Sequence, residues 1–420
     1  MSTFIIKGQQ TLGGEIKVGG AKNAALKIIP AAILSDEPLI ISNLPDIEDT
    51  KRSLEVFSSL GGEIQTNDQE TTIHLKTISK QSLDPHLANK FRASIMFVGP
   101  LLARTGEVFF PHPGGCVIGA GTRPIDLFLE GYKCLGAEVS IENDGYHLQA
   151  QRLKGNTYFF TKISVTGTES LMMTAVLAEG TTILKNCASE PEIVELANYL
   201  NRCGAKISGA GTSTITIEGV TKIHGGNFEI MPDRIETGTF AILAAAARSP
   251  LTITHCCPEH IEILLTIFKQ MGIGFTTGKN WLSINSFPKE LPAYSIKTHE
   301  YPGFPTDLQS PFTVLMTQAH GSSLIHETIY DRRLLFTDML TQMGANITMC
   351  DPHRVVVQGP TKLQGKSLTS PDLRAGISMI IAGIIAQGTT KIDNIYQIER
   401  GYENIEKRLK SIGVDIERSE

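Results

Sequence analysis

The stretch SLMMTAVLAEGTTILKNCASEPEIVELANYLNRCGAKISGAGTSTITIEG, residues 170–219, decides the fold of this chain. Its first nine residues, 170–178, are apolar on all sides and predict a buried helix. Residues 181–186 are rich in β-branched side chains and predict a short strand. An amphipathic run that stops at Gly204 predicts a second helix, and residues 205–219 predict a hairpin around a Gly-rich turn. The unit is therefore helix, strand, helix, hairpin.

The same unit recurs along the whole chain. A glycine that ends an amphipathic run and precedes a strand appears six times, at intervals of 68 to 75 residues. These glycines are Gly61, Gly136, Gly204, Gly272, Gly344 and Gly413. Six copies of roughly seventy residues account for the whole chain. Self-similarity at a nearly fixed period indicates a repeat architecture.

An apolar helix is predicted at the start of each copy. The six segments are residues 24–34, 93–103, 170–178, 239–247, 311–319 and 375–386. A unit of this size cannot cover an all-apolar helix, so the copies must share a core. Pro30 and Pro100 are expected to kink the first two helices.

Three copies per domain predict two domains of similar size. The first is expected to span residues 21–232 and to carry a catalytic loop. The second is expected to combine residues 1–20 with 233–420, because the strand predicted from Phe4 to Val18 can pair with the far domain. The predicted class is therefore α/β (α+β) with pseudo-symmetric domains.

Composition and charge limit the classes of partner. The chain has 420 residues, 41% of them apolar, and a formal net charge of −5, which gives no global attraction to nucleic acid or to an anionic membrane. The longest apolar stretch, 379–386, is far shorter than the roughly 20 residues of a spanning helix. Residues 1–18 hold no apolar run of signal-peptide length. Seven scattered cysteines fit reduced thiols, so we expect a cytoplasmic protein.

Charged residues stand just before the predicted buried helices. Asn, Asp and Ser at these places are explained as helix caps, namely Asn23, Ser164, Asp307 and Asp372. The cations Lys22, Arg92 and Arg374 are not, because a positive charge opposes the dipole at a helix N-terminus. Such cations suit a bound anion that lies between them and the free N–H groups; ion pairing with Asp233, Glu236 and Asp372 is the alternative. The recurrence favours an anionic ligand with several phosphates or carboxylates.

The loop FPHPGGCVIGAG, residues 110–121, carries a single cysteine, Cys116. Gly and Pro at this density predict a loop. A free cysteine is most often a small buried apolar residue, whereas an accessible one on a loop is reactive. The loop by itself leaves both interpretations open.

Several stretches together resemble the enolpyruvyl transferase family. They are GGAKNAALKIIPAAIL, GGCVIGAGTRPIDL, LAEGTTILKNCASEPEIVELANYL, PDRIETGTF, FPTDLQSPFTVL and DLRAGISMIIAG, and they cover the chain from end to end. The resemblance implies an inside-out α/β barrel of two pseudo-symmetric domains with three units each. It also implies transfer of an enolpyruvyl group from phosphoenolpyruvate to the 3′-hydroxyl of UDP-N-acetylglucosamine, with release of phosphate, at the first committed step of peptidoglycan synthesis.

The resemblance also implies roles for individual residues. Cys116 matches the acid that protonates the methylene carbon, and fosfomycin, an epoxide phosphonate, would alkylate it. Asp307 matches the base, and Lys22, Arg123 and Arg400 match groups that hold phosphoenolpyruvate. Further predicted substrate contacts are Asn23, Arg92, Pro124, Ile125, Asp126, Leu127, Lys162, Ile163, Ser164, Val165, Ile329, Arg333 and Arg374. No metal and no cofactor are expected, and we expect a monomer whose partners are the two small-molecule substrates.

Rival functions rest on weaker patterns. A cysteine hydrolase would pair Cys116 with His112, but Pro113 and two glycines separate them. The segment GPTKLQGKS, residues 359–367, has one residue too many for a P-loop. The segment THCCPEH, residues 254–260, suggests a metal site by composition, yet in the repeat it matches an ordinary loop. The remaining alternative is a silent paralogue that binds UDP-sugars and regulates.

Overall fold

The computed structural model describes residues 2–67, 69–112 and 125–419. They form two compact units. Unit 1 holds the described residues up to Gly19 and from Pro232 onward, and unit 2 holds those from Gly20 to Met231. The boundaries between the units, at 19/20 and 231/232, each lie one residue from a predicted domain boundary. The identification of unit 2 with the catalytic-loop domain, and of unit 1 with the second domain, stays a prediction.

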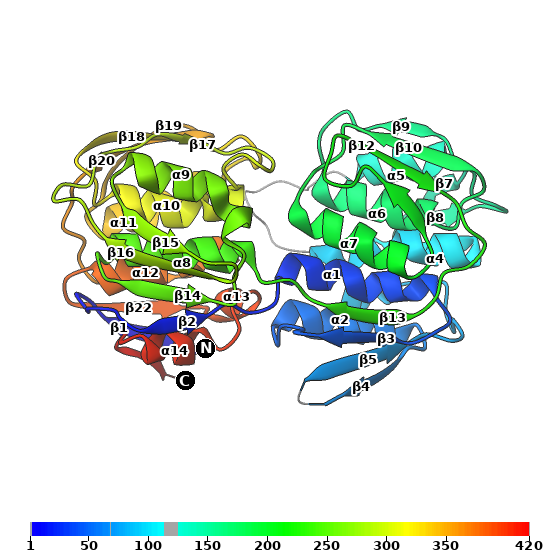
Figure 1. The fold of residues 1–420 in the computed structure, drawn as a ribbon, viewed down its shortest axis with the longest axis horizontal. Coiled ribbons are helices and arrows are strands. Elements are labelled where there is room, and N and C mark those ends of the chain that lie inside the picture. The colour runs from blue at the N-terminus through cyan, green and yellow to red at the C-terminus, as the bar shows by residue number, and fades with distance from the viewer. Residues whose placement is uncertain (1, 68, 113–124, 420) are drawn as a thin grey trace. The chain divides into compact units, whose positions relative to one another are not determined.

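Unit 2 holds the first three copies (Figure 1). The first consists of α1 (Lys22–Ala31), η1 (Ala32–Leu34), β3 (Leu39–Ser42), α2 (Glu48–Ser59), β4 (Glu63–Thr66) and β5 (Glu70–His74). The second consists of α3 (Pro85–Ala88), η2 (Arg92–Phe97), α4 (Val98–Thr105), β6 (Glu107–Pro111), α5 (Asp126–Cys134), β7 (Glu138–Ile141) and β8 (Gly145–Gln149). The third consists of β9 (Thr157–Phe159), α6 (Val165–Ala175), β10 (Thr181–Lys185), α7 (Pro191–Arg202), β11 (Lys206–Ser208) and β12 (Thr214–Glu218), and β13 (Gly226–Glu229) follows it.

Unit 1 holds the other three copies and the N-terminal strands β1 (Thr3–Lys7) and β2 (Glu15–Lys17). The fourth copy consists of α8 (Arg234–Ala246), β14 (Leu251–Thr254), η3 (Pro258–Ile261), α9 (Glu262–Gln270), β15 (Gly274–Thr277) and β16 (Trp281–Ser286). The fifth consists of β17 (Ile296–Lys297), η4 (Thr306–Leu308), α10 (Gln309–Met316), β18 (Gly321–His326), η5 (Arg333–Phe336), α11 (Thr337–Gln342), β19 (Asn346–Asp351) and β20 (Arg354–Gly359). The sixth consists of β21 (Ser367–Thr369), α12 (Leu373–Ile385), β22 (Thr389–Asp393), α13 (Tyr396–Glu399), α14 (Ile405–Ser411) and β23 (Ile416–Ser419).

The predicted order of helix, strand, helix and hairpin is confirmed in the third copy, where β10 pairs with β12 and β12 with β11, all antiparallel. All six of the repeat glycines have positive φ, from 74° to 101°. Glycine adopts this left-handed conformation at little cost, which is why it follows the end of a helix so often. The prediction of six equivalent helix ends is therefore confirmed.

Each copy supplies most of the strands of one small sheet. The orders are β13-β3-β5-β4, β6-β8-β7, β11-β12-β10-β9, β15-β16-β14-β2, β17-β18-β20-β19 and β21-β22-β1-β23. In most of them a short parallel strand borders the strand that follows the buried helix, as β9 borders β10. These edge strands could not be predicted from the sequence, because two to four residues carry no readable period.

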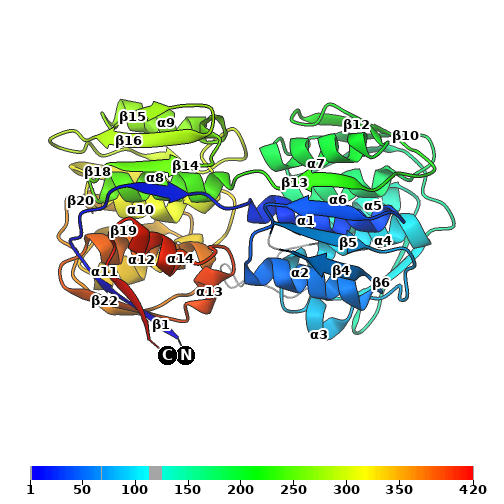
Figure 2. The ribbon, with the colours of Figure 1, turned by 60° about the horizontal axis from the view of Figure 1, so that its bottom comes forward.

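The N-terminal segment crosses into the C-terminal half, as predicted, but it is two strands rather than one. The strand β1 lies between β22 and β23, and β2 lies beside β14 in a different sheet. Gln9 has a φ of 58° and Gly14 a φ of 88°, so the backbone cannot stay extended between the two strands. Both chain ends lie side by side, because Thr3 is paired with Ser419 (Figure 2).

Apolar helices fill the interior of each unit. In unit 1, α8, α10 and α12 lie inside the surrounding sheets (Figure 1), and in unit 2 the corresponding segments are α1, α4 and α6. Each unit has its own apolar core. Near both prolines the predicted helix is divided: η1 follows α1 just after Pro30, and η2 precedes α4, which contains Pro100. In the described residues, no helix is long and apolar enough to cross a membrane.

The interior of unit 2 contains a lysine and a glutamate that face each other in the middle of its helices. Lys27 Nζ of α1 lies 3.3 Å from Glu169 Oε2 of α6, and both side chains are buried. Within the described residues, neither oxygen of Glu169 has a hydrogen-bond partner. Burial raises the pKa of Glu169 to about 8, Glu192 and Glu190 add to the rise, and Lys27 opposes it. The folded chain therefore favours the protonated carboxyl group.

Replacing Glu169 with glutamine should change how the free energy of unfolding depends on pH. Because the pKa of Glu169 rises on folding, its stabilising contribution is complete below the unfolded pKa of about 4.3 and is lost as pH rises through the folded pKa. Glutamine keeps an acceptor for Lys27 but cannot ionise. Denaturant unfolding at several pH values should show wild type losing stability relative to Glu169→Gln as pH rises from about 4.3 towards 8. A difference that does not vary with pH would contradict this expectation.

Candidate active site

Asp307 lies between two arginines in unit 1. Its Oδ1 accepts from Arg333 Nη2 at 2.7 Å, and its Oδ2 accepts from Arg374 Nη2 at 2.8 Å. Asp307 belongs to η4, Arg333 begins η5, and Arg374 is the second residue of α12. The Asp307 side chain is 25% exposed, whereas those of Arg333 and Arg374 are 4% and 6% exposed. The fold thus brings together three predicted site residues from two copies.

The two arginines control the ionisation of Asp307. Burial alone would raise the pKa of Asp307, but the charges of Arg374 and Arg333 outweigh it and hold the pKa well below its usual range. The group is therefore a carboxylate at neutral pH. While both guanidinium groups are bound to it, however, it is a weak proton acceptor.

Arg374 is held in place from its other side by a tyrosine. Arg374 Nη1 donates to the hydroxyl of Tyr402 at 3.2 Å, and that hydroxyl lies 3.0 Å from Thr239 Oγ1. Burial raises the pKa of Tyr402 to about 12, so the phenol stays neutral. Arg400 is two residues before Tyr402, is buried, and donates from Nη1 to Gln397 Oε1 at 3.1 Å.

The segment around Ile329 is connected to the same cluster. The Ile329 N–H donates to Glu327 Oε1 at 2.8 Å, and Glu327 Oε2 accepts from Thr306 Oγ1 at 2.7 Å. Thr306 directly precedes Asp307. Neither Glu327 nor Thr306 was predicted from the sequence, because no pattern shows which glutamate of a loop is buried.

Unit 2 holds the second set of predicted site residues. Lys22, the first residue of α1, is buried and pairs with Asp49 of α2 at 2.7 Å. Asn23 is the second residue of α1, and Arg92 is the first residue of η2. Asp49 was not predicted from the sequence, since nothing in PDIEDT distinguishes it from its less buried neighbours Asp46 and Glu48.

The other predicted contacts of unit 2 lie at the starts of α5 and α6. Asp126 and Leu127 begin α5, directly after Ile125, and the Leu127 carbonyl accepts from the Tyr158 hydroxyl at 2.9 Å. Lys162 and Ile163 lie in the loop before α6, Ser164 caps that helix, and Val165 is its first residue. Three predicted site residues, Cys116, Arg123 and Pro124, lie outside the described residues.

The predicted helix caps are right in two cases and wrong in two. Ser164 Oγ accepts from the Gly167 N–H, and Asp372 Oδ1 accepts from the N–H groups of Arg374 and Ala375. Asn23 is not a cap, because α1 already begins at Lys22. Asp307 is not a cap either, because its two oxygens are taken by guanidinium groups, which are stronger donors than backbone N–H groups.

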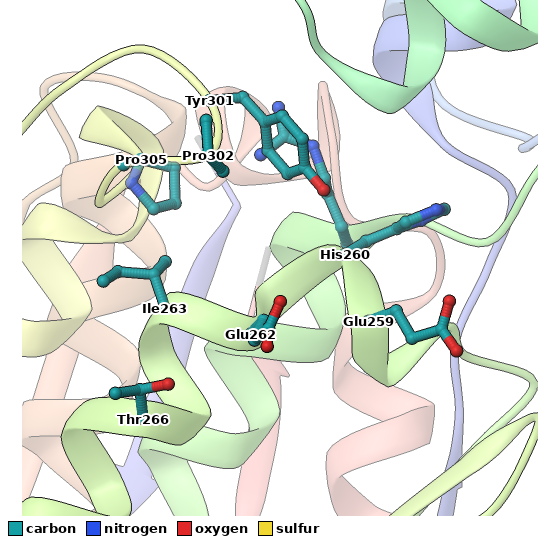
Figure 3. Close-up of a pocket in the computed structure, with 10 residues that line it drawn as sticks. Glu259, His260, Glu262, Ile263, Thr266, Tyr301, Pro302 and Pro305 are labelled. Atoms are coloured by element: carbon teal, nitrogen blue, oxygen red, sulfur yellow. The ribbon is translucent and has the colours of Figure 1, made fainter. Parts of the chain in front are cut away.

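A cavity of about 190 Å³ in unit 1 is lined in part by residues of the segment 301–305, which directly precedes Thr306 and Asp307 (Figure 3). Its lining residues are Arg234, Glu259, His260, Glu262, Ile263, Thr266, Tyr301, Pro302, Gly303 and Pro305. None of these ten was predicted as a site residue. The guanidinium of Arg234 lies 5.7 Å from the ring centre of Tyr301. These two lining residues of the cavity therefore make a cation–π contact with each other.

The motifs behind the rival functions have ordinary structural roles. The THCCPEH segment spans the end of β14 and the start of η3, and the described residues contain no group of three or more His, Cys, Asp or Glu side chains that could hold a metal ion. The GPTKLQGKS segment connects β20 to β21, so it lacks the helix that follows a P-loop. The six described cysteines are free thiols.

A family model described as EPSP synthase (3-phosphoshikimate 1-carboxyvinyltransferase) matches residues 6–409. The chain is also similar to proteins named UDP-N-acetylglucosamine 1-carboxyvinyltransferase. One, from Treponema denticola, is 45% identical over 428 residues and covers 100% of both chains. Another, from Proteus mirabilis, is 42% identical over 421 residues and covers 100% of this chain and 99% of the relative.

Solved structures show the same fold. The enolpyruvyl transferase NikO from Streptomyces tendae has a TM-score of 0.90 at 22% identity, covering 100% of this chain and 99% of its own. An EPSP synthase from Acinetobacter baumannii has a TM-score of 0.76 at 18% identity and covers 100% of both chains. The predicted α/β class, with two pseudo-symmetric halves of three units, is therefore confirmed.

Proposed function

Because the chain belongs to the EPSP synthase family of enolpyruvyl transferases, we propose that it transfers the enolpyruvyl group of phosphoenolpyruvate to the 3′-hydroxyl of UDP-N-acetylglucosamine and releases phosphate. This reaction is the first committed step of peptidoglycan synthesis. Full-length similarity to proteins with that enzyme's name supports the choice of acceptor. The observation that carries the chemistry is Asp307, a carboxylate held by two buried arginines.

In the proposed addition step, one proton enters and one leaves. Cys116 gives its thiol proton to the methylene carbon of phosphoenolpyruvate, which makes the adjacent carbon electrophilic. The 3′-hydroxyl oxygen bonds to that carbon, and its proton passes to Asp307. In the elimination step, the Cys116 thiolate takes a proton from the methyl carbon, which restores the double bond, and phosphate leaves the adjacent carbon with the proton that Asp307 had accepted.

The two arginines bound to Asp307 connect the binding of phosphoenolpyruvate to the basicity of Asp307. Phosphoenolpyruvate carries a phosphate and a carboxylate, and both are good partners for a guanidinium. An anion that binds Arg333 or Arg374 draws positive charge away from Asp307. The pKa of Asp307 then rises towards the range in which a carboxylate accepts a proton from a hydroxyl. In this proposal, the base becomes effective only when the anionic substrate is present.

The remaining predicted residues complete the proposed binding site. Lys22, Arg123 and Arg400 hold phosphoenolpyruvate, and the residues at the starts of α1, α5 and α6, together with Arg92 and Ile329, contact the UDP-sugar. We assign the catalytic loop to a domain of residues 21–232, with 1–20 and 233–420 forming the other. We further propose that the chain works as a monomer in the cytoplasm without a metal or cofactor.

Release of inorganic phosphate from phosphoenolpyruvate tests the proposed function directly. We expect release that depends on UDP-N-acetylglucosamine and a product whose mass exceeds that of the sugar nucleotide by one enolpyruvyl group. Phosphate release without the sugar nucleotide would point to a hydrolase. Binding of the sugar nucleotide with no release under any condition would favour the silent, regulatory paralogue.

A further inference from the structure

Glu327 is a fully buried carboxylate between two parts of the candidate site. Within the described residues, its oxygens accept hydrogen bonds from four neutral donors. Oε1 accepts from Thr298 Oγ1 at 3.2 Å and from the N–H groups of Ile329 at 2.8 Å and Tyr330 at 3.1 Å, and Oε2 accepts from Thr306 Oγ1 at 2.7 Å. A glutamine at this position could not accept in the same way, because its amide would present N–H groups on one side.

The position of Glu327 fixes the direction of the Thr306 hydroxyl. A threonine hydroxyl has one proton, and here it points to Glu327 Oε2, so the oxygen can only accept from Arg333 Nη1, which lies 2.7 Å away. The other nitrogen of the same guanidinium, Nη2, donates to Asp307 Oδ1 at 2.7 Å. The planar guanidinium therefore spans two consecutive residues, Thr306 and Asp307, and its orientation is set from both ends.

Glu327 also fixes the segment that leads to Arg333. Its Oε1 holds the backbone of Ile329 and Tyr330, and the Arg333 guanidinium lies 5.1 Å from the ring centre of Tyr330. Burial lowers the pKa of Arg333, but the charges of Asp307 and Glu327 outweigh it and raise the pKa. One carboxylate thus acts on Arg333 through Thr306, through the Tyr330 segment and through its charge.

We propose that Glu327 is a positioning residue that, through the Thr306 hydroxyl, holds the Arg333 guanidinium where it both orients Asp307 and can bind the anionic substrate. The inference rests on the proposed function, because Asp307 matters as a base only if the chain catalyses the transfer. Glu327 itself does not touch the reacting atoms in this scheme. Removal of Glu327 is expected to lower turnover by displacing the Arg333 guanidinium, because a displacement of about 1 Å in an active site can lower the rate about a hundredfold.

A set of matched variants separates this role from simple support of the fold. Glu327→Gln and Thr306→Val each break the connection from Glu327 to Arg333. Thr298→Val is the control, since it also removes one hydroxyl donor from Glu327 but leaves Thr306 intact. Thr306→Ser is the rescue, because serine keeps the hydroxyl. For each variant, kcat, the KM of both substrates and the denaturant midpoint of unfolding are measured.

We expect Glu327→Gln and Thr306→Val each to lower kcat about ten- to hundredfold, with the KM of the sugar nucleotide changed less than about threefold. The double variant should be no slower than the slower single variant, because both act on one connection. Thr306→Ser and Thr298→Val should keep kcat within about threefold of wild type, even if Thr298→Val lowers the unfolding midpoint as much as Thr306→Val.

Three results would overturn the inference. The first is a Thr306→Val enzyme with wild-type kcat. The second is a double variant in which the losses of kcat from Glu327→Gln and Thr306→Val multiply. The third is a Thr298→Val enzyme as slow as Thr306→Val. If Glu327→Gln fails to fold, Thr306→Val with its serine rescue still decides. A wild-type chain that releases no phosphate would overturn the proposed function and this inference with it. Active wild type with unaffected Thr306→Val overturns the inference alone.

Discussion

Replacing Asp307 with asparagine should lower turnover about 10²- to 10⁴-fold, the usual contribution of a general base. Asparagine keeps the shape of the side chain and can still accept from one arginine, but it cannot take a proton from the 3′-hydroxyl. Calorimetry should show near-normal binding of UDP-N-acetylglucosamine. The KM of phosphoenolpyruvate should not rise, because Arg333 and Arg374 are then released from a competing carboxylate.

Asp84→Asn provides the control for this substitution. Asp84 is a true cap, whose carboxylate accepts from the His86 N–H at 2.8 Å, and asparagine caps a helix as well as aspartate does. Turnover of Asp84→Asn should therefore equal that of wild type. If Asp307→Asn behaves in the same way, with a loss of less than about tenfold, Asp307 has only a structural role.

Replacing Cys116 with serine should nearly abolish turnover. The reference pKa of a thiol is about 8.5, so near neutral pH Cys116 is mostly protonated and can act as an acid, whereas a serine hydroxyl is a far weaker acid. Cys116→Asp should keep activity with a lower pH optimum, because a carboxyl group protonated beside bound phosphate loses its proton at lower pH than a thiol.

Mass spectrometry separates the role of Cys116 from that of an ordinary thiol. Wild type treated with fosfomycin should gain one adduct on Cys116, and Cys116→Asp should be resistant. Cys350, an exposed thiol on β19, is the control, and Cys350→Ser should keep both activity and sensitivity. Full activity in Cys116→Ser would end the acid role and return this cysteine to a packing role.

The repeat could be predicted from the sequence because each copy ends its second helix with a glycine, and those glycines all have positive φ. Other features leave no such trace. The edge strand Thr157–Phe159 is too short for a period, and the assignment of Phe4 to Val18 to one strand was wrong because the turn between β1 and β2 depends on tertiary packing. Local propensity decides where a helix ends, but not which sheet a short strand joins.

The candidate site was predictable by residue type and not by contact. Asp307 is 26 residues from Arg333 and 67 from Arg374 in the sequence, and no local rule connects such positions. Asp307 and Asn23 were expected to be caps, because a polar residue before an apolar run usually is one. The buried partners Glu327, Asp49 and Tyr402 were missed, since burial of a polar side chain depends on the whole fold.

The place of β1 between β22 and β23 has a consequence for the synthesis of the chain. β1 leaves the ribosome long before β23, yet Thr3 and Ser419 are paired. The described residues of unit 2 all lie between Gly20 and Met231, so this unit can fold while translation proceeds, as domains generally do. By contrast, β2 must wait unpaired until β14 has emerged, and β1 must wait until β22 and β23 have emerged. A chain terminated before residue 415 would leave β1 with β22 as a neighbour and one edge open, which is the kind of unpaired strand edge that invites aggregation.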